Sequence, residues 1–124
     1  MATDKINLGL QGETLAVFFL KKNGFNILET NFRTKFCEID IIAKEDNTLC
    51  FIEVKTRTSL KKGLPKESVN PAKQKKIILG AQFYLKSCRL DNIRVRFDVV
   101  EIYVNTEKDS APHIHIIKNA FWAV

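Results

Sequence analysis

The sequence predicts a mixed α/β fold, an α+β mixed sheet assembled in the order helix, three-stranded meander, helix and further strands. Two observations predict it. Apolar residues recur at helical spacing in two segments, and they alternate with polar residues in the segments between and after these two. The chain has 124 residues, of which 45% are hydrophobic and nine are phenylalanine. This is enough for one packed core, so we expect residues 1–124 to form one domain.

Residues 8–22 are expected to form the first helix, because apolar residues recur there at near-helical spacing. The pair Asn23-Gly24 follows as a stop signal, and Glu13 lies off the apolar stripe. The stripe consists of Leu8, Leu15, Ala16, Phe19 and Leu20.

Three strands are expected near residues 26–33, 37–44 and 48–57, because the period of the pattern changes to two. We interpret them as an antiparallel meander. Alternation then gives the second and third strands one apolar face each. These faces are Ile39, Ile41 and Ala43 in the second strand and Cys50, Ile52 and Val54 in the third.

The opposite faces of these two strands carry charges. Glu38 and Asp40 share a face of the second strand, and Glu53, Lys55 and Arg57 share a face of the third. Because adjacent strands lie side by side, Asp40 and Glu53 are expected to meet. The polar side of the meander is therefore unusually rich in carboxylates.

A second helix is expected after a loop at residues 58–69. Asn70 is a typical N-cap and Pro71 suits the first helical position. The expected buried stripe of this helix is Ile77, Ile78, Ala81, Tyr84 and Leu85. A long alternating strand at 93–104, a polar loop at 105–112 and a short strand at 114–117 complete the prediction.

Charge and cysteine content limit the classes of function. Net charge is +6, and residues 53–80 carry eight Lys or Arg against two Asp or Glu. Such a local basic field fits a polyanionic partner or a merely solvated face. The longest apolar run, residues 15–20, is far below the roughly 20 residues that span a bilayer, so we expect no membrane association. The three cysteines form no C-x-x-C pair, and we interpret them as buried thiols of a cytoplasmic protein.

Asp40 and Glu53 are the residues that point to metal chemistry. Two converging carboxylates repel each other unless a cation lies between them, and oxygen ligands suit Mg²⁺, for which Mn²⁺ commonly substitutes. The backbone carbonyl of Val54 is available as a further ligand. Lys55, on the same face as Glu53, is placed to orient or deprotonate a water or to stabilise charge at phosphorus. Glu-x-Lys alone also fits cross-strand pairing on a solvated face.

Two motifs stand out, Cys37-Glu38-Ile39-Asp40 and Phe51-Ile52-Glu53-Val54-Lys55-Thr56-Arg57, together with Gly12-Glu13 and Lys73. Their pattern resembles the PD-(D/E)xK superfamily of restriction-endonuclease-like nucleases, and more narrowly the YraN-like family of bacteria. Archaeal Holliday-junction resolvases have a similar arrangement of helix glutamate, strand aspartate and Glu-x-Lys strand. Cys37 departs from the family, which usually has glycine there.

The resemblance implies a restriction-endonuclease-like core and a role for each matching residue. Asp40 and Glu53 correspond to metal ligands, Lys55 to the catalytic lysine and Glu13 to the acidic residue that the first helix contributes. Glu38 and Lys73 follow as second-tier site residues. Glu38 has the alternative of an ion pair with Arg33. Lys73 opposes the dipole of its helix, which we interpret as support for a role at the site.

Basic residues around this centre are candidates for nucleic-acid binding, each phosphate contact making binding more salt-sensitive. They are Arg33, Arg57, Lys61, Lys62, Lys75 and Lys76. His113 and His115 share a strand face, but two ligands alone do not make a metal site. Phe121 and Trp122 either pack on the core, which we favour, or serve the interface of a homodimer.

The resulting hypothesis is a metal-dependent endonuclease that hydrolyses phosphodiester bonds of DNA, with branched or flap DNA as candidate substrates. The alternative is a non-catalytic nucleic-acid-binding module that keeps the nuclease fold, because fold does not fix function. The intact set of acidic residues and lysine favours the enzyme.

Overall fold

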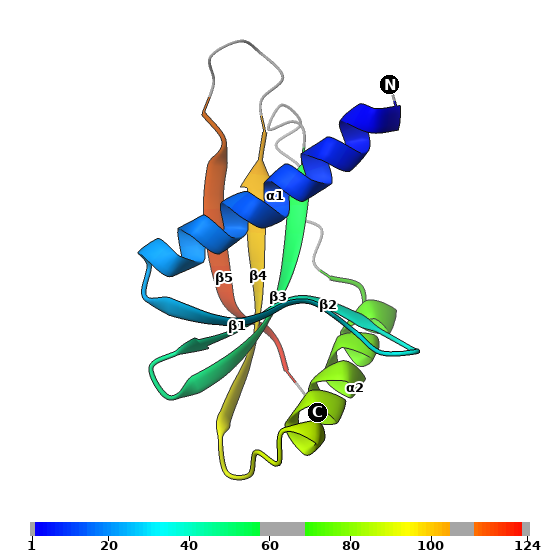
Figure 1. Cartoon of the computed structure of the whole chain (residues 1–124), viewed down its shortest axis with the longest axis vertical. Helices are drawn as coiled ribbons and strands as arrows, with labels where there is room; N and C mark the ends of the chain where they lie inside the picture. The colour runs from blue at the N-terminus through cyan, green and yellow to red at the C-terminus, as the bar shows by residue number, and fades with distance from the viewer. Residues whose placement is uncertain (1, 58–68, 105–110, 123–124) are drawn as a thin grey trace.

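A computed structural model describes residues 2–57, 69–104 and 111–122 of the chain. The predicted order of elements is confirmed (Figure 1). The elements are α1 (Ala2–Lys22), β1 (Phe25–Arg33), β2 (Glu38–Glu45), β3 (Thr48–Arg57), α2 (Pro71–Ser87), β4 (Arg94–Tyr103) and β5 (His113–Phe121). Of the helices in these ranges, none combines the length and apolar character needed to cross a membrane.

The five strands form one mixed sheet in the order β1-β2-β3-β4-β5. β1, β2 and β3 pair antiparallel, as the meander predicts, and β5 pairs antiparallel with β4. β3 and β4 run parallel. Two parallel neighbours need a long crossover between them, and the segment containing α2 provides it.

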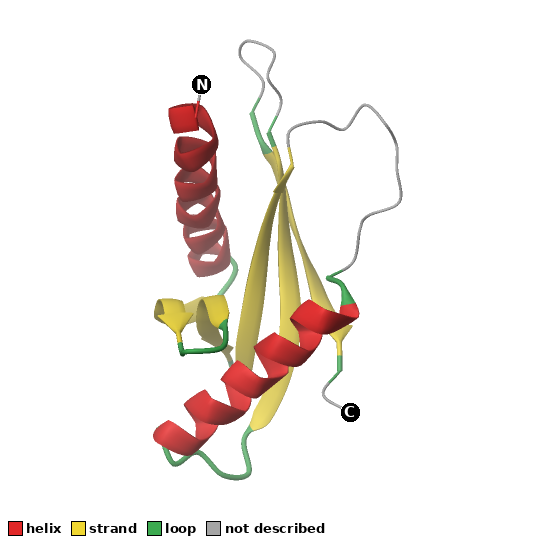
Figure 2. Cartoon of the chain, turned by 90° about the vertical axis from the view of Figure 1, so that its right-hand side faces the viewer, coloured by secondary structure: helices red, strands yellow, loops and turns green. Residues whose placement is uncertain are grey.

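The core has two layers, because the helices cover opposite sides of the sheet (Figure 2). Ala16 and Leu20 of α1 belong to one apolar cluster, whereas Ile77 and Ala81 of α2 belong to the other. β3 is buried on both faces over its first half. Leu49 and Phe51 join the α2 cluster, and Cys50 and Ile52 join the α1 cluster. The sequence pattern placed Leu49 and Phe51 on the same face as Glu53, and helix α2 covers that face over the first half of the strand.

Local signals explain where the helices end and begin. The side chain of Asn70 accepts a hydrogen bond from the Lys73 N–H at 2.9 Å, so α2 begins with the predicted cap and Pro71. Gly24 has φ of +90°, a conformation that side chains disfavour, and it turns the chain from α1 into β1. α1 itself begins at Ala2, earlier than the expected residue 8.

β5 is longer than predicted, since it spans nine residues instead of 114–117. Lys118 and Asn119 interrupt its apolar pattern, but both have partners. Lys118 Nζ binds Glu45 at 2.9 Å, and the Asn119 N–H donates to the buried carboxylate of Asp98 at 3.0 Å. Asn119 has φ of +54° beside a register shift between β4 and β5. Pairing therefore continues through a bulge that the sequence pattern does not reveal.

Two residues expected in the interior, Cys88 and Trp122, are exposed. Of the cysteines, Cys50 is buried, Cys37 is half-buried and Cys88 is exposed, so the expectation of three buried thiols is wrong for Cys88. Cys88 forms the C-cap of α2, where the chain leaves the core. Phe121 packs in the core as expected, whereas the side chain of Trp122, just beyond β5, is 70% exposed.

Candidate metal centre

The candidate centre lies where β2 separates from β3. The ladder between these strands runs from Glu45 and Thr48 to Ile41 and Ile52 and stops there. Beyond it, the Asp40 carboxylate lies between the strands and accepts a hydrogen bond from the Val54 N–H at 2.8 Å. Asp40 thus satisfies a backbone donor that would otherwise have paired with β2. The sequence had pointed to the Val54 carbonyl, and the contact that the structure describes uses the N–H.

The divergence of the strands also changes the faces of β2. Ile39 belongs to the α2 cluster, whereas Ile41 and Ala43 belong to the α1 cluster. The prediction that all three share a face is therefore wrong for Ile39. Asn31, between the partners of Ile39 and Ile41 on β1, has φ of +52°. A left-handed residue at this point marks an irregular twist of the hairpin, which ends the simple alternation.

Asp40 and Glu53 meet as predicted. Glu53 acts on Asp40 both through a side-chain hydrogen bond and through its charge. Burial, this hydrogen bond and the charge of Glu53 together raise the pKa of Asp40 from its ordinary 3.8 to about 8, against the opposing effect of the Val54 N–H. Glu53 is only 4% exposed. The pair therefore holds its second negative charge back unless a cation is supplied.

Lys73 supplies one positive charge to this pair. Its Nζ lies 2.6 Å from Glu53 Oε2, although it comes from the first turn of α2. The pKa of Lys73 is raised, first by the hydrogen bond with Glu53 and further by the charges of Asp40 and Glu38. The expectation that Lys73 points at the centre agrees with this geometry.

Glu13 acts on the centre through its charge, and the helix that carries it, α1, approaches β3 very closely. A Cβ at Gly12 would lie 2.2 Å from Thr56 Oγ1, a distance that no side chain permits. The contact fixes the turn of helix that carries Glu13, and the negative charge of Glu13 adds to the raised pKa of Asp40. Gly12 belongs to the family motif, but its reason is visible only when α1 and β3 are seen together.

The remaining predicted residues divide into those near the centre and those engaged elsewhere. Lys55 is half-buried and follows Glu53 by two positions in β3, so alternation places it on the same face. Glu38 forms an ion pair with Arg33, its cross-strand neighbour, which agrees with the alternative weighed from the sequence. Arg57 Nε lies 3.5 Å from Glu101 Oε2, a buried carboxylate.

The basic residues predicted to bind nucleic acid lie only partly within the described residues. Lys75 and Lys76 are exposed on α2. Lys61 and Lys62 lie outside the described residues. His115 Nε2 is 2.7 Å from Glu101 Oε1, so the buried carboxylate of Glu101 lies between a histidine and an arginine. Sequence patterns do not reveal this cluster, because Arg57, Glu101 and His115 come from three different strands, β3, β4 and β5.

The donor set fits a hard divalent cation that keeps part of its water shell. Asp40 and Glu53 offer carboxylate oxygens to a common cation, and a bound cation would offset the charge of Glu53 that helps to raise the pKa of Asp40. Within residues 12–57, 69–104 and 111–122, no three His, Cys, Asp or Glu side chains form a complete metal-binding group. Two carboxylates leave coordination positions for water and a phosphate, as is usual for Mg²⁺.

Fold and site together define a class of protein, an α+β protein whose mixed sheet brings two carboxylates and a Glu-x-Lys strand to one point. A family model described as Uncharacterised protein family UPF0102 matches residues 12–102. The chain belongs to this family, which is the YraN-like family that its motifs resemble.

Relatives of similar length share about half of their residues with this chain. A UPF0102 protein of Desulforapulum autotrophicum is 50% identical over 121 residues, which cover 98% of each chain. A UPF0102 protein of Caldicellulosiruptor saccharolyticus is 49% identical and covers 95% of this chain and 99% of its own. Among solved structures, Hjc, a Holliday junction resolvase of Archaeoglobus fulgidus, matches 86% of this chain and 74% of its own, with a TM-score of 0.44 and 16% identity.

Proposed function

We propose that this protein is a metal-dependent nuclease that hydrolyses phosphodiester bonds of DNA. The observation that carries the proposal is the buried acidic pair at the point where β2 leaves β3: Asp40 accepts the Val54 N–H at 2.8 Å, and Glu53, 4% exposed, contacts Lys73 Nζ at 2.6 Å. A buried acidic pair is costly to a fold, and such pairs concentrate where a functional cation or proton is handled. The Glu-x-Lys motif and the resemblance to PD-(D/E)xK nucleases support the same reading.

Each side chain has a defined part in this proposal. Asp40 and Glu53 hold Mg²⁺ or Mn²⁺ through carboxylate oxygens, with Glu13 adding negative charge from α1. The bound ion lowers the pKa of water and offsets charge on the phosphate. Lys55 positions the attacking water, or stabilises the negative charge that grows on the phosphoryl oxygens. Lys73 balances Glu53 when the cation is absent and is free to contact a phosphate once the cation is present.

Cleavage assays with purified variants test the proposal. Wild-type protein and the Glu53→Ala and Lys55→Ala variants are incubated with single-stranded, duplex, flap and four-way-junction DNA and Mg²⁺ or Mn²⁺. We expect the wild type to cut at least one substrate, EDTA to abolish cleavage, and each variant to lose at least about 100-fold, as when a group that stabilises the transition state is removed. Lys86→Ala, in the last turn of α2, is the matched control and keeps full activity.

The outcomes separate the two functions weighed from the sequence. Equal cleavage by wild type and both variants would show a contaminating nuclease and sink the assignment. DNA binding that persists in EDTA, without Mn²⁺ binding and without cleavage, would favour the non-catalytic binding module. Lys73 would then serve permanently to neutralise the charge of Glu53.

A further inference from the structure

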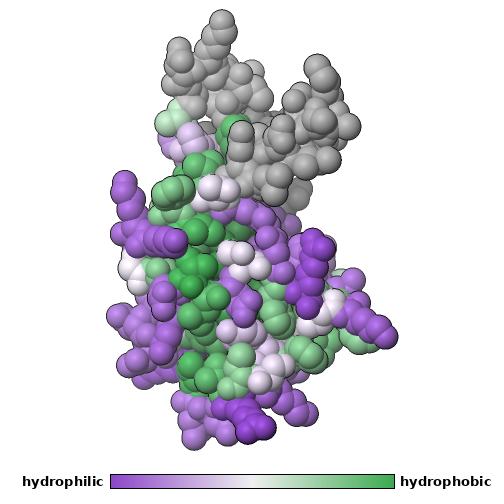
Figure 3. All heavy atoms as spheres, in the orientation of Figure 1, coloured by the Kyte–Doolittle hydropathy of each residue, from purple (hydrophilic) through white to green (hydrophobic). Residues whose placement is uncertain are grey.

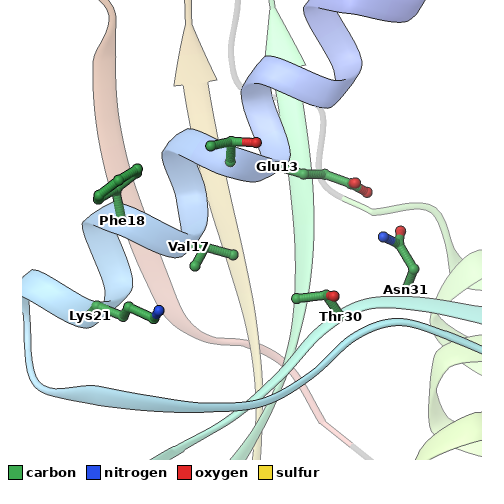
Figure 4. Close-up of a pocket in the computed structure, with 7 residues that line it drawn as sticks. Glu13, Val17, Phe18, Lys21, Thr30 and Asn31 are labelled. Carbon is green, nitrogen blue, oxygen red and sulfur yellow. The ribbon is translucent and has the colours of Figure 1, made fainter.

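A groove opens between α1 and β1, and its lining includes Glu13, whose charge contributes to the raised pKa of Asp40. It has a volume of about 350 Å³ and shares Glu13 with the centre. Figure 4 shows Glu13 and Asn31 at one end of the groove and Lys21 towards the other. The face of the molecule that carries the groove shows a band of apolar residues bordered by polar ones (Figure 3). A ligand at the Glu13 end of the groove would therefore contact a side chain whose charge acts on Asp40.

Phe18 is the feature of the groove that packing does not explain. Its side chain is 69% exposed, whereas its neighbours in the core, Ala16 and Leu20, are fully buried. An aromatic ring held on a helix surface offers one π-face to a planar ligand. Stacking on such rings is the main sequence-independent way in which proteins bind unpaired bases.

The polar residues of the groove complement a nucleotide. Lys21 is exposed, and eight helical residues, about 12 Å, separate it from Glu13. An ammonium group at that distance can bind a phosphate without neutralising the metal centre. Thr30 and Asn31 of β1 add hydroxyl and amide groups along the opposite wall. The wall thus offers stacking, charge and hydrogen bonding to one strand.

We propose that this groove binds a short unpaired stretch of DNA strand next to the phosphodiester bond at the metal centre, with a base stacked on Phe18 and a phosphate on Lys21. The inference rests on the proposed function and names its substrate class, DNA with a single-stranded segment beside the cleaved bond. A base inside a duplex has no free face for Phe18, because its neighbours already stack on it.

Binding measurements with matched variants test the groove. A fluorescein-labelled oligothymidylate and a duplex of equal length are titrated with protein in Ca²⁺, and fluorescence anisotropy gives Kd over a range of salt. Phe18→Ala is compared with Phe83→Ala, which removes a ring that is 57% exposed on α2. Lys21→Ala is compared with Lys22→Ala, its exposed neighbour outside the groove lining.

We expect Phe18→Ala to raise the Kd for oligothymidylate about fivefold or more and to leave duplex binding unchanged. Lys21→Ala should lower the slope of log K against log salt by about 0.7, the value for one lost contact with a single strand. The two control variants should bind as the wild type does. Calorimetric Mn²⁺ binding and thermal unfolding establish that each variant keeps its metal centre and its fold.

Two results overturn the inference in distinguishable ways. If the wild type binds and cuts DNA but each groove variant matches its control, the strand lies elsewhere and the proposed function stands. If the wild type binds Mn²⁺ but neither DNA probe, both the groove and the nuclease are wrong.

Discussion

At the scale of single residues, the protonation of Asp40 is determined by its burial and by Glu53 and Val54 beside it. Its side chain lies between β2 and β3, accepts the Val54 N–H and has a pKa that burial and Glu53 raise. A carboxyl group placed in this way stays protonated well above its ordinary pKa. Both folding stability and metal binding should therefore depend on pH in a manner that can be assigned to Asp40.

The first prediction concerns that pH dependence in the absence of metal. The pKa of Asp40 is raised to about 8 in the folded protein, so between about pH 4 and pH 8 the folded state holds a proton that the unfolded state has released. This contribution favours folding at low pH and is lost as pH rises towards 8. Asp40→Asn, which cannot ionise, should remove it. Urea unfolding of both proteins across this range measures the difference, and parallel stability curves would contradict the prediction.

The second prediction concerns Lys73, whose ammonium group occupies the position closest to Glu53. Lys73→Ala removes a cation that competes with the metal, so Mn²⁺ should bind more tightly. The gain should be up to about fivefold, because an ion pair whose lysine is half-exposed is worth about 1 kcal/mol or less. Titration calorimetry measures it, with Lys75→Ala, also exposed on α2, as control. Weaker Mn²⁺ binding by Lys73→Ala would mean that the lysine supports the site instead of competing for it.

At the scale of elements, the centre depends on how closely α1 lies against β3. Gly12 allows the approach, and Glu13 follows it to within electrostatic reach of Asp40. An equivalent close contact joins α2 to the hairpin, since a Cβ at Gly80 would lie 2.3 Å from Cys37 Sγ. A glycine thus allows each helix to pack closely on the sheet, Gly12 in α1 and Gly80 in α2.

The third prediction tests whether the contact between Gly12 and Thr56 holds α1 against β3. Gly12→Ala places a methyl group against Thr56, which is stiff at χ1 and cannot move aside easily. The variant should lose about 1 kcal/mol or more of unfolding free energy, although alanine favours the helix. Adding Thr56→Ala should restore most of the loss, as a double-mutant cycle by urea unfolding would show. Additive effects of the two substitutions would mean that the contact does not hold α1 in place.

At the scale of the whole molecule, a bound cation should stabilise the fold, because it binds the assembled centre and not the unfolded chain. The fourth prediction follows. Mn²⁺ at about 100 times its Kd should add about 2.7 kcal/mol and raise Tm by on the order of 10 °C. EDTA should reverse the rise, and Glu53→Gln should abolish it. Differential scanning calorimetry makes the measurement, and an equal rise in Glu53→Gln would place the metal at another site.

Much of this arrangement could be predicted from the sequence, because its signals are local. Periodicity identified the order of elements, the cap at Asn70 fixed the start of α2, and adjacency in a meander brought Asp40 to Glu53. The approach of Lys73 to Glu53 could be expected from the position of Lys73 in the first turn of α2.

The parts that could not be predicted depend on contacts between distant segments. The two buried faces of β3 arise only when helices cover both sides of the sheet. Where β2 separates from β3, and at the bulge at Asn119, the backbone N–H groups bond to side chains on other strands. Alternation describes an ideal strand, so the predicted face of Ile39 was wrong. It also does not show where strand pairing ends, and Trp122 lies just beyond Phe121, the last paired residue of β5.

The parallel pairing of β3 with β4 has a consequence for the order in which the chain assembles. Hairpin contacts such as Glu45 with Thr48 are local, whereas Thr48 reaches Arg94 only after the crossover closes. Local contacts form sooner, so we expect Asp40 and Glu53 to meet before α2 delivers Lys73. Early in folding the two carboxylates would then repel each other unless a proton or a divalent ion bridges them. Stopped-flow refolding should accordingly be faster at pH 6 than at pH 9 in EDTA, and Mg²⁺ should remove the difference.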